Sequence, residues 1–198
     1  MIIRLTAILM AASALTACGA SEQTAEPAAA SATTTVASPA AAGDRTVFSD
    51  PGLGIAFDHA SARRTGPCPD GEEAGCVALF EGDKHVISLQ LKDGAVGAVA
   101  AAEAGFERNA DGVLMTTYGR FAPVPVEPFS GPGWTGLRAR VICGVSDEET
   151  GFHAAGGECL WAVIGDGERA VVASTQGILG LDDDTMRTLT SIRFLPRA

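Results

Sequence analysis

The chain has 198 residues, with 24 acidic residues against 14 lysines and arginines, so its formal net charge is −10 at pH 7. Proteins that bind nucleic acid gather lysine and arginine on one face, and this balance argues against a nucleic-acid partner. It also argues against direct electrostatic binding to anionic lipid headgroups.

The first residues have the pattern of an export signal. Arg4 supplies one positive charge, Leu5–Leu15 is an apolar run, and the small residues Thr16 and Ala17 follow. A charged head, an apolar stretch of about 7–15 residues and small residues before a cleavage site are typical of a secretory signal peptide. The run is too short to cross a membrane, which takes about 20 apolar residues. We predict a signal peptide over residues 1–17.

Leu15-Thr16-Ala17-Cys18 resembles the lipobox of bacterial lipoproteins, which is a leucine, two small residues and a cysteine. The resemblance implies cleavage before Cys18 and attachment of a lipid carrying fatty acids such as palmitate to its thiol. The lipid bilayer is then a partner, and the protein lies outside the cytoplasm. Gly19 replaces the aspartate that resembles an inner-membrane retention signal, which favours the outer membrane, facing the periplasm. An ordinary cleaved signal with an unrelated cysteine is the alternative.

Residues 18–43 are predicted to form an acylated cysteine and a disordered tether. Gly19–Gly43 is mainly alanine, serine, threonine, proline and glutamate, with Val36 as its one large aliphatic residue. Such a segment buries too little apolar surface to offset the entropy of ordering. An alanine-rich helix is the competing interpretation, and Pro27 and Pro39 count against it. Residues 44–198 are predicted to be a single globular domain.

Cys68, Cys76, Cys143 and Cys159 remain in that domain. An even number of cysteines in an exported protein indicates disulfides, and proximity in sequence favours Cys68–Cys76 and Cys143–Cys159. A zinc site is the alternative, but C-x-x-C and H-x-H spacings are absent from the sequence.

Regular elements are predicted along the whole domain. Strands are expected at Leu53–His59, Cys76–Gly82 and His85–Leu91, and apolar residues at helical spacing predict a helix within Gly94–Arg108. Gly112–Gly119 and Ala122–Phe129 are further strand candidates, the second at a sheet edge because of its prolines.

The clearest hairpin pairs Trp134–Cys143 with Glu158–Gly165, in a register that brings Cys143 opposite Cys159. A strand at Arg169–Thr175, a short helix capped by an aspartate in the Asp182-Asp183-Asp184 run and a strand at Ile192–Leu195 complete the pattern. We expect an α+β fold, a mainly antiparallel sheet with two helices packed on it.

Three stretches resemble the PsbP/Mog1-like α/β sandwich proteins: Phe48–His59, Gly133–Val141 and Leu181–Phe194. The family often begins with a glycine-aromatic strand and ends with a helix that runs into a "SIRF"-type strand. The resemblance implies that fold and a tendency to bind or assist partners, and it supplies no catalytic residues.

The segment between the hairpin strands is the candidate binding loop, because it is long, acidic and closed at its base by the predicted Cys143–Cys159 bond. Its candidate residues are Asp147, Glu148, Glu149, His153 and Glu158. These side chains could hold a divalent cation, and the alternative is a solvated hairpin loop. The Asp182-Asp183-Asp184 run is explained by helix capping rather than by calcium.

The sequence predicts no cofactor and no catalytic residues. It contains no G-x-S-x-G, and His59, His85 and His153 are scattered. Trp134 and Trp161 are expected in the core, with a ligand groove as the alternative. We therefore expect a membrane-anchored binding or accessory module with an envelope protein as its partner. An inhibitor of an extracytoplasmic enzyme, or a hydrolase with an unrecognised site, are the alternatives.

Overall fold

The computed structural model describes residues 44–69, 74–119, 121–147, 152–175 and 181–196, and for 144–147 and 152–156 it describes the backbone alone. These residues belong to a compact unit, Pro39–Ala198. The predicted signal peptide and the tether, Cys18 included, lie outside the described residues. Among the described helices, none has the length and apolar character needed to cross a membrane.

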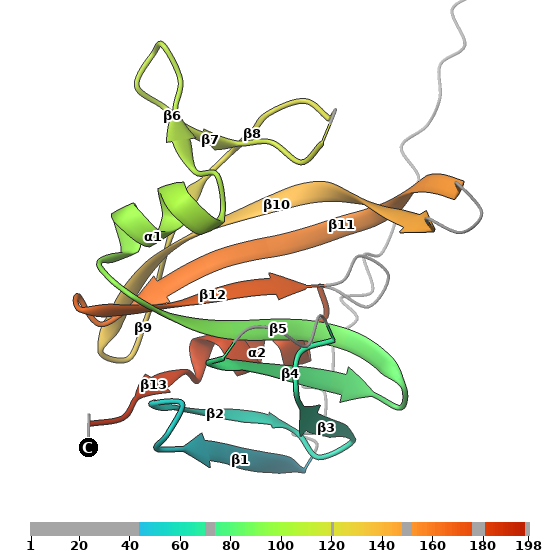
Figure 1. Cartoon of the computed structure of the whole chain (residues 1–198), viewed down its shortest axis with the longest axis vertical. Coiled ribbons are helices and arrows are strands. Elements are labelled where there is room, and N and C mark those ends of the chain that lie inside the picture. The colour runs from blue at the N-terminus through green and yellow to red at the C-terminus, as the bar shows by residue number, and fades with distance from the viewer. Residues whose placement is uncertain (1–43, 70–73, 120, 148–151, 176–180, 197–198) are drawn as a thin grey trace, which may run out of the picture. The chain divides into compact units, whose positions relative to one another are not determined.

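The largest element of the described fold is a seven-stranded antiparallel sheet, in the order β3-β4-β5-β12-β11-β10-β9 (Figure 1). Its strands are β3 (Arg63–Gly66), β4 (Cys76–Glu81), β5 (Lys84–Asp93), β9 (Glu127–Gly131), β10 (Trp134–Asp147), β11 (Phe152–Gly165) and β12 (Arg169–Thr175). Sequence neighbours pair through hairpins at β4–β5, β9–β10, β10–β11 and β11–β12, whereas β5 and β12 meet from distant parts of the chain.

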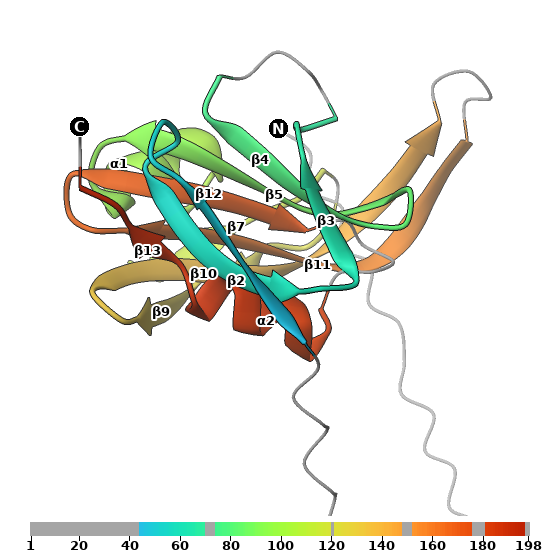
Figure 2. The ribbon, with the colours of Figure 1, turned by 90° about the horizontal axis from the view of Figure 1, so that it is seen from below.

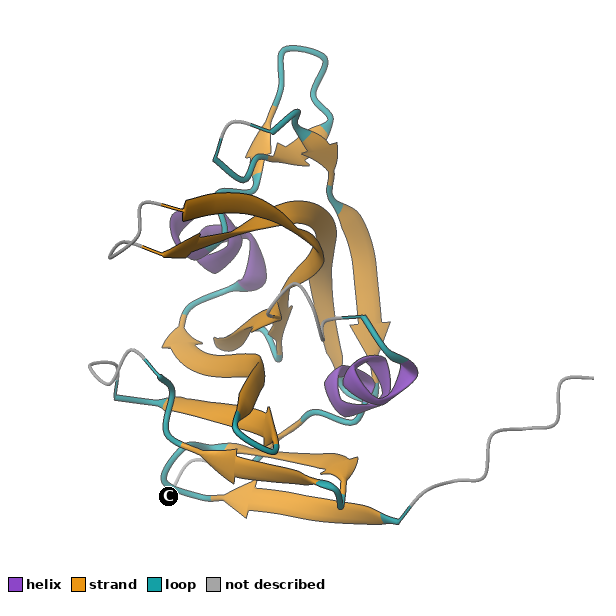
Figure 3. Cartoon of the chain, turned by 90° about the vertical axis from the view of Figure 1, so that its right-hand side faces the viewer, coloured by secondary structure: helices purple, strands orange, loops and turns teal. Residues whose placement is uncertain are grey.

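Two smaller antiparallel sheets complete the described strands. One has the order β1-β2-β13, from β1 (Arg45–Asp50), β2 (Ile55–Ala60) and β13 (Arg193–Phe194). The other has the order β6-β7-β8, from β6 (Glu107–Arg108), β7 (Leu114–Thr116) and β8 (Val124–Pro125). Figure 3 shows the strands in orange and the two described helices in purple.

The helices α1 (Val96–Glu103) and α2 (Asp183–Thr190) pack on opposite faces of the seven-stranded sheet. Side chains alternate between the faces of a strand. On β11, Ile164 packs in one apolar cluster with Leu189 of α2, while Val163 packs in the other cluster with Val99 of α1. The core therefore has two layers that share this sheet, and the β1-β2-β13 sheet adds Ile55 and Phe57 to the layer of α2.

The antiparallel sheets with two described helices confirm the expected α+β class. Helix α1 is shorter than the apolar spacing indicated, because Gly94 adopts a φ of 127° before it and Gly105 a φ of 59° after it. Helix α2 begins as predicted, since the Asp182 side chain accepts a hydrogen bond from the Thr185 backbone N–H.

The predicted register of the long hairpin is wrong at its cysteines. Cys159 lies opposite Val141, and the ladder shifts between Ile142 and Gly144. Because Val141 faces Cys159, Cys143 bonds to Cys159 from a position two residues further along β10 instead of directly across the ladder. The shift lies beyond this pair: Gly156 and Gly157 of β11 stand against Cys143 alone, which makes a β-bulge in β11.

Candidate functional site

The β10–β11 hairpin extends well beyond its neighbours in the sheet. Strand β9 pairs with β10 over Trp134–Arg138, and β12 pairs with β11 over Trp161–Gly165. In the described part of the chain, Ala139–Asp147 and Phe152–Leu160 are paired with each other alone, and we name this ribbon the β-arm. At about 3.3 Å per residue it reaches up to roughly 30 Å past Arg138. Figure 2 shows the two strands projecting away from the remaining strands.

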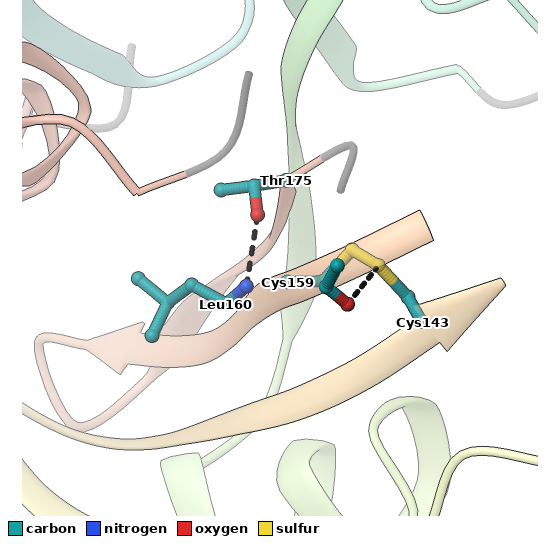
Figure 4. Close-up of a disulfide and its surroundings, with 5 residues drawn as sticks. Cys143, Cys159, Leu160 and Thr175 are labelled. Atoms are coloured by element: carbon teal, nitrogen blue, oxygen red, sulfur yellow. Dashed lines mark hydrogen bonds between the residues drawn. A yellow bond between two sulfur atoms is a disulfide. The ribbon is translucent and has the colours of Figure 1, made fainter. Parts of the chain in front are cut away.

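A disulfide joins the two strands of the β-arm at its root. Cys143 and Cys159 are 5% and 3% exposed, and they pack in the same apolar cluster as Val99 and Phe106. A two-stranded ribbon without a covering layer is only marginally stable in water. The bond, drawn in Figure 4, therefore locks the two strands together, and the packing of Val141 and the two cysteines against Val99 and Phe106 holds the root of the β-arm on the body.

A hydrogen bond closes the sheet where the β-arm leaves it. The Leu160 backbone N–H donates to the Thr175 side-chain oxygen at 2.8 Å, in a buried position (Figure 4). The β11–β12 ladder ends one residue away, at Trp161 opposite Ser174. The hydroxyl thus replaces the backbone partner that a longer β12 would supply.

The residues of the predicted binding loop are spread along the β-arm. Asp147 pairs with Phe152 and Ser146 with His153 at its outer end, where the backbone alone is described. Glu148 and Glu149 lie outside the described residues. Glu158 is at the root, exposed, with its Oε2 atom 3.9 Å from Nη1 of Arg140. Contact among these five side chains therefore stays a prediction.

Beside the root of the β-arm lies a cleft of about 410 Å³, lined by Val124, Pro125, Glu127, Arg138 and Arg140. Arg138 donates to Glu127 at 3.4 Å, and its guanidinium carbon lies 5.1 Å from the centre of the Phe129 ring. Arg140 is more exposed and shares the same face of β10. The alternation of these arginines with Leu137 and Val141 in the sequence indicates that the arginines lie on the solvent-exposed face of the strand. No sequence pattern indicates that β8 and β9 form the wall of a cleft beside them.

Two further hollows lie elsewhere on the unit. One, of about 380 Å³, lies between the β1–β2 turn and the ends of β3 and β4, and Cys76 is among the residues that line it. The other, of about 600 Å³, lies beside the β6–β7 hairpin and is lined by residues such as Arg108, Asn109 and Thr116. Neither was expected from the sequence, because each joins segments that are distant along the chain or irregular.

The charged groups with perturbed pKa values are structural. Burial alone would raise the pKa of Asp182, but hydrogen bonds from Thr185 and the charge and hydrogen bond of Arg63 hold it below its usual range. Arg63 has a buried side chain, and it contacts Asp182, the Thr185 hydroxyl at 3.1 Å and Glu81 at 3.5 Å. This arrangement ties the start of α2 to β3.

The pKa of Asp166 is also set by burial and hydrogen bonding acting in opposite directions. Burial raises its pKa, while the side-chain and backbone hydrogen bonds of Arg169 and the backbone N–H of Glu168 lower it by more, so the net shift is downward. Arg169 binds this carboxylate at 2.6 Å and lies over the Phe194 ring. The pair fixes the β11–β12 turn to β13.

The described residues bring one serine and histidine pair together and no cluster of metal ligands. The Ser88 hydroxyl lies 2.9 Å from Nε2 of His85, three residues away on β5. No group of three or more His, Cys, Asp or Glu side chains that could hold a metal ion occurs in the described ranges. Trp134 is buried and donates from its ring nitrogen to the Ile192 carbonyl, while Trp161 is half-buried against the edge of Tyr118.

No protein-family model matches the chain. No curated protein matches it either. Similar solved structures include a crystal structure from Bacteroides thetaiotaomicron with 11% identity and a TM-score of 0.49, covering 78% of this chain and 49% of that one. The chain thus spans about half the length of the Bacteroides structure.

A second similar structure is the solution structure of cyanobacterial PsbP (CyanoP) from Synechocystis, with 10% identity, a TM-score of 0.43 and coverage of 80% of this chain and 98% of that one. It belongs to the PsbP group that the chain resembles in the order of its elements. Because both TM-scores are below 0.5, neither likeness supports an inference about function. The function is therefore inferred from the chain's own residues.

Proposed function

We propose that the chain is a lipid-anchored binding module of the bacterial cell envelope, held on a membrane through Cys18 and non-catalytic in its globular part. The observation that carries the binding role is the β-arm, a projecting ribbon fixed at its root by the Cys143–Cys159 bond. A contact surface that is already ordered loses little conformational freedom on binding, so more of its contact energy is expressed as affinity.

Within the part of the chain that the structure describes, the outer edges of the β-arm are also unpaired. Natural sheets usually protect such edges, because free N–H and C=O groups are templates for pairing with another chain. Ile142, on the β-arm, is 46% exposed and lies beside the exposed Glu158. An apolar side chain next to charged groups on a projecting ribbon is suited to contact with a protein surface.

An inhibitor of an extracytoplasmic enzyme is the second candidate. The projecting β-arm favours this candidate, since a narrow disulfide-linked ribbon can enter a cleft that a flat surface cannot reach. An inhibitor would be distinguished from a binding module by loss of the target enzyme's activity on binding.

The anchor is tested by Cys18→Ser. We expect this variant to leave the membrane fraction or to persist as an uncleaved precursor, and to lose fatty-acid labelling. Unchanged membrane fractionation with unchanged labelling would contradict the lipoprotein proposal and leave the binding proposal standing.

The binding surface is tested by photo-crosslinking from a reactive amino acid placed at Ile142 in cells that produce the full chain. Reversing the charges of Asp147, Glu148 and Glu149 to lysine should reduce the yield of the crosslinked partner about tenfold, which corresponds to about 1.4 kcal/mol. The matched control reverses Asp44, Asp83 and Glu168, which are exposed and lie outside the two strands of the β-arm. If both triple variants crosslink as the unmodified chain does, the three acidic residues are not part of the contact. If no crosslink forms from Ile142, the partner binds elsewhere, and the strands that carry Trp134 and Trp161 are the next surface to probe.

A further inference from the structure

The two disulfides of the domain lie in different surroundings. Cys143 and Cys159 are buried in the apolar cluster beneath α1. Cys68 and Cys76 are half-buried, and the neighbouring Pro67, Pro69 and Gly75 are exposed or half-buried. Because a thiolate must reach a sulfur atom directly to exchange with it, these two bonds differ in their access to a reductant.

A cavity lies beside the Cys68–Cys76 bond. Cys76 is among the residues that line this cavity of about 380 Å³, together with Thr65, Gly66 and Gly75. Gly66 and Gly75 have no side chain, and the β1–β2 turn adds Asp50, Gly52 and Leu53 to the lining. Cavities of about 300 Å³ or more hold small organic molecules, so a thiol reagent fits this one.

Strand pairing holds Cys76 without help from the disulfide. Cys76 lies opposite Gln90 in the β4–β5 ladder, and the Leu91 N–H donates to the Gly75 carbonyl at 2.9 Å. On the other side, Gly66 lies opposite Ala78 in the β3–β4 ladder. Opening the bond therefore leaves the strand that carries Cys76 in place, and the change is reversible.

We propose that the Cys68–Cys76 bond is a thiol–disulfide exchange site for a dithiol, while the Cys143–Cys159 bond is permanent. One thiolate of the dithiol enters through the cavity and attacks Sγ of Cys76, and Cys68 leaves as a thiolate. The second thiol of the reagent then attacks the mixed disulfide and releases Cys76. The protein disulfide gains two electrons and two protons, and the dithiol is oxidised to its disulfide. This inference is independent of the binding role of the β-arm.

The test is differential alkylation of the full chain, purified from membranes in a mild detergent. The native protein is exposed to dithiothreitol for graded times, free thiols are blocked with one alkylating reagent, and the remainder are reduced and blocked with an isotopic form of it. We expect Cys68 and Cys76 to be reduced at least about tenfold faster than Cys143 and Cys159. Equal rates, or faster reduction of Cys143 and Cys159, overturn the proposal. Reduced thioredoxin in place of dithiothreitol shows whether a protein dithiol reaches the same bond, and its failure restricts the site to small dithiols.

The cavity route has its own control. Thr65→Phe places a ring in the cavity wall and should slow reduction of Cys68–Cys76 about fivefold, whereas Thr117→Phe, in the hollow beside β7, should not. If neither variant changes the rate, the cavity is not the route. If Thr65→Phe fails to fold, the monothiol glutathione decides instead, because attack through the cavity places its mixed disulfide on Cys76, and a mixed disulfide on Cys68 rejects the route.

Discussion

Two buried threonines provide a test of the packing with opposite expected signs. The Thr175 hydroxyl accepts the Leu160 N–H at 2.8 Å, and Thr175 is 2% exposed. The Thr188 hydroxyl of α2 is also buried, and it has no hydrogen-bond partner within the described residues. Replacing each threonine by valine exchanges a hydroxyl for a methyl group of nearly the same size, so the two variants differ mainly in what the hydroxyl does.

We expect Thr175→Val to lower the free energy of unfolding by about 1–3 kcal/mol, because it leaves the buried Leu160 N–H without an acceptor. For a domain of this size the melting temperature should fall by roughly 2–4 °C per kcal/mol. Thr188→Val should leave the stability unchanged or raise it by up to about 1 kcal/mol, since it removes a buried hydroxyl that makes no bond.

The measurement is urea unfolding of the purified protein with its disulfides intact, followed by tryptophan fluorescence and far-UV circular dichroism. Both variants should unfold with the slope of the unmodified protein, so that a shift of the midpoint reports stability alone. Equal destabilisation by the two substitutions would refute the reasoning, because it would mean that the loss of either hydroxyl costs the same whether or not it is bonded.

The other expectations concern the ion pair at α2, the disulfides and the glycines. The lowered pKa of Asp182 means that its contribution to stability is present above about pH 5 and is lost as the pH falls. Because its side chain is 46% exposed and screened by water, Asp182→Asn should cost about 0.5–1 kcal/mol at pH 7, and it should reduce this pH dependence in unfolding curves measured from pH 7 to pH 3. A midpoint with undiminished acid sensitivity in the variant would contradict this assignment. Peptide mapping without reduction should recover Cys68 with Cys76 and Cys143 with Cys159, and a crossed pair would reject both the bulged ladder and the exchange site. Gly136→Ala should lower the free energy of unfolding by more than about 1 kcal/mol, since its Cβ would lie 2.5 Å from the Val163 carbonyl oxygen. Gly97→Ala in α1 meets no atom within 4 Å and should raise the free energy of unfolding by about 0.5–1 kcal/mol. Both are measured by thermal melts, and a loss of stability in both variants would refute the steric argument.

Local patterns in the sequence predicted most of the hairpin strands and both helices. Alternation at Leu137, Ala139 and Val141 reflects burial of one face under α1, and Asp182 is a typical helix cap. Strands β1 and β3 were missed, because their outer residues are polar or exposed and give no alternating pattern. The pairing of β5 with β12 is a contact between distant segments, and local residue preferences carry no information about it.

The candidate site was predicted in part. The cysteine spacing indicated the Cys143–Cys159 disulfide at the root of the β-arm. The two strands continue past this disulfide, because backbone hydrogen bonding between strands needs no apolar side chains. The polar composition from Gly144 onward led to the prediction of a loop where the structure has paired strands. The bulge in β11 opposite Cys143 could not be predicted either, since one extra residue in a strand leaves the composition unchanged.

The place of β13 has a consequence for the order of folding events. Strand β2 lies between β1 and β13, and the Asp58 backbone N–H donates to the Ser191 hydroxyl across a separation of 133 residues. The β1-β2-β13 sheet is therefore completed only after nearly the whole domain has been synthesised, and contacts of such long sequence separation slow folding. A chain of this connectivity cannot close this sheet until β13, close to its C-terminal end, is available to pair with β2.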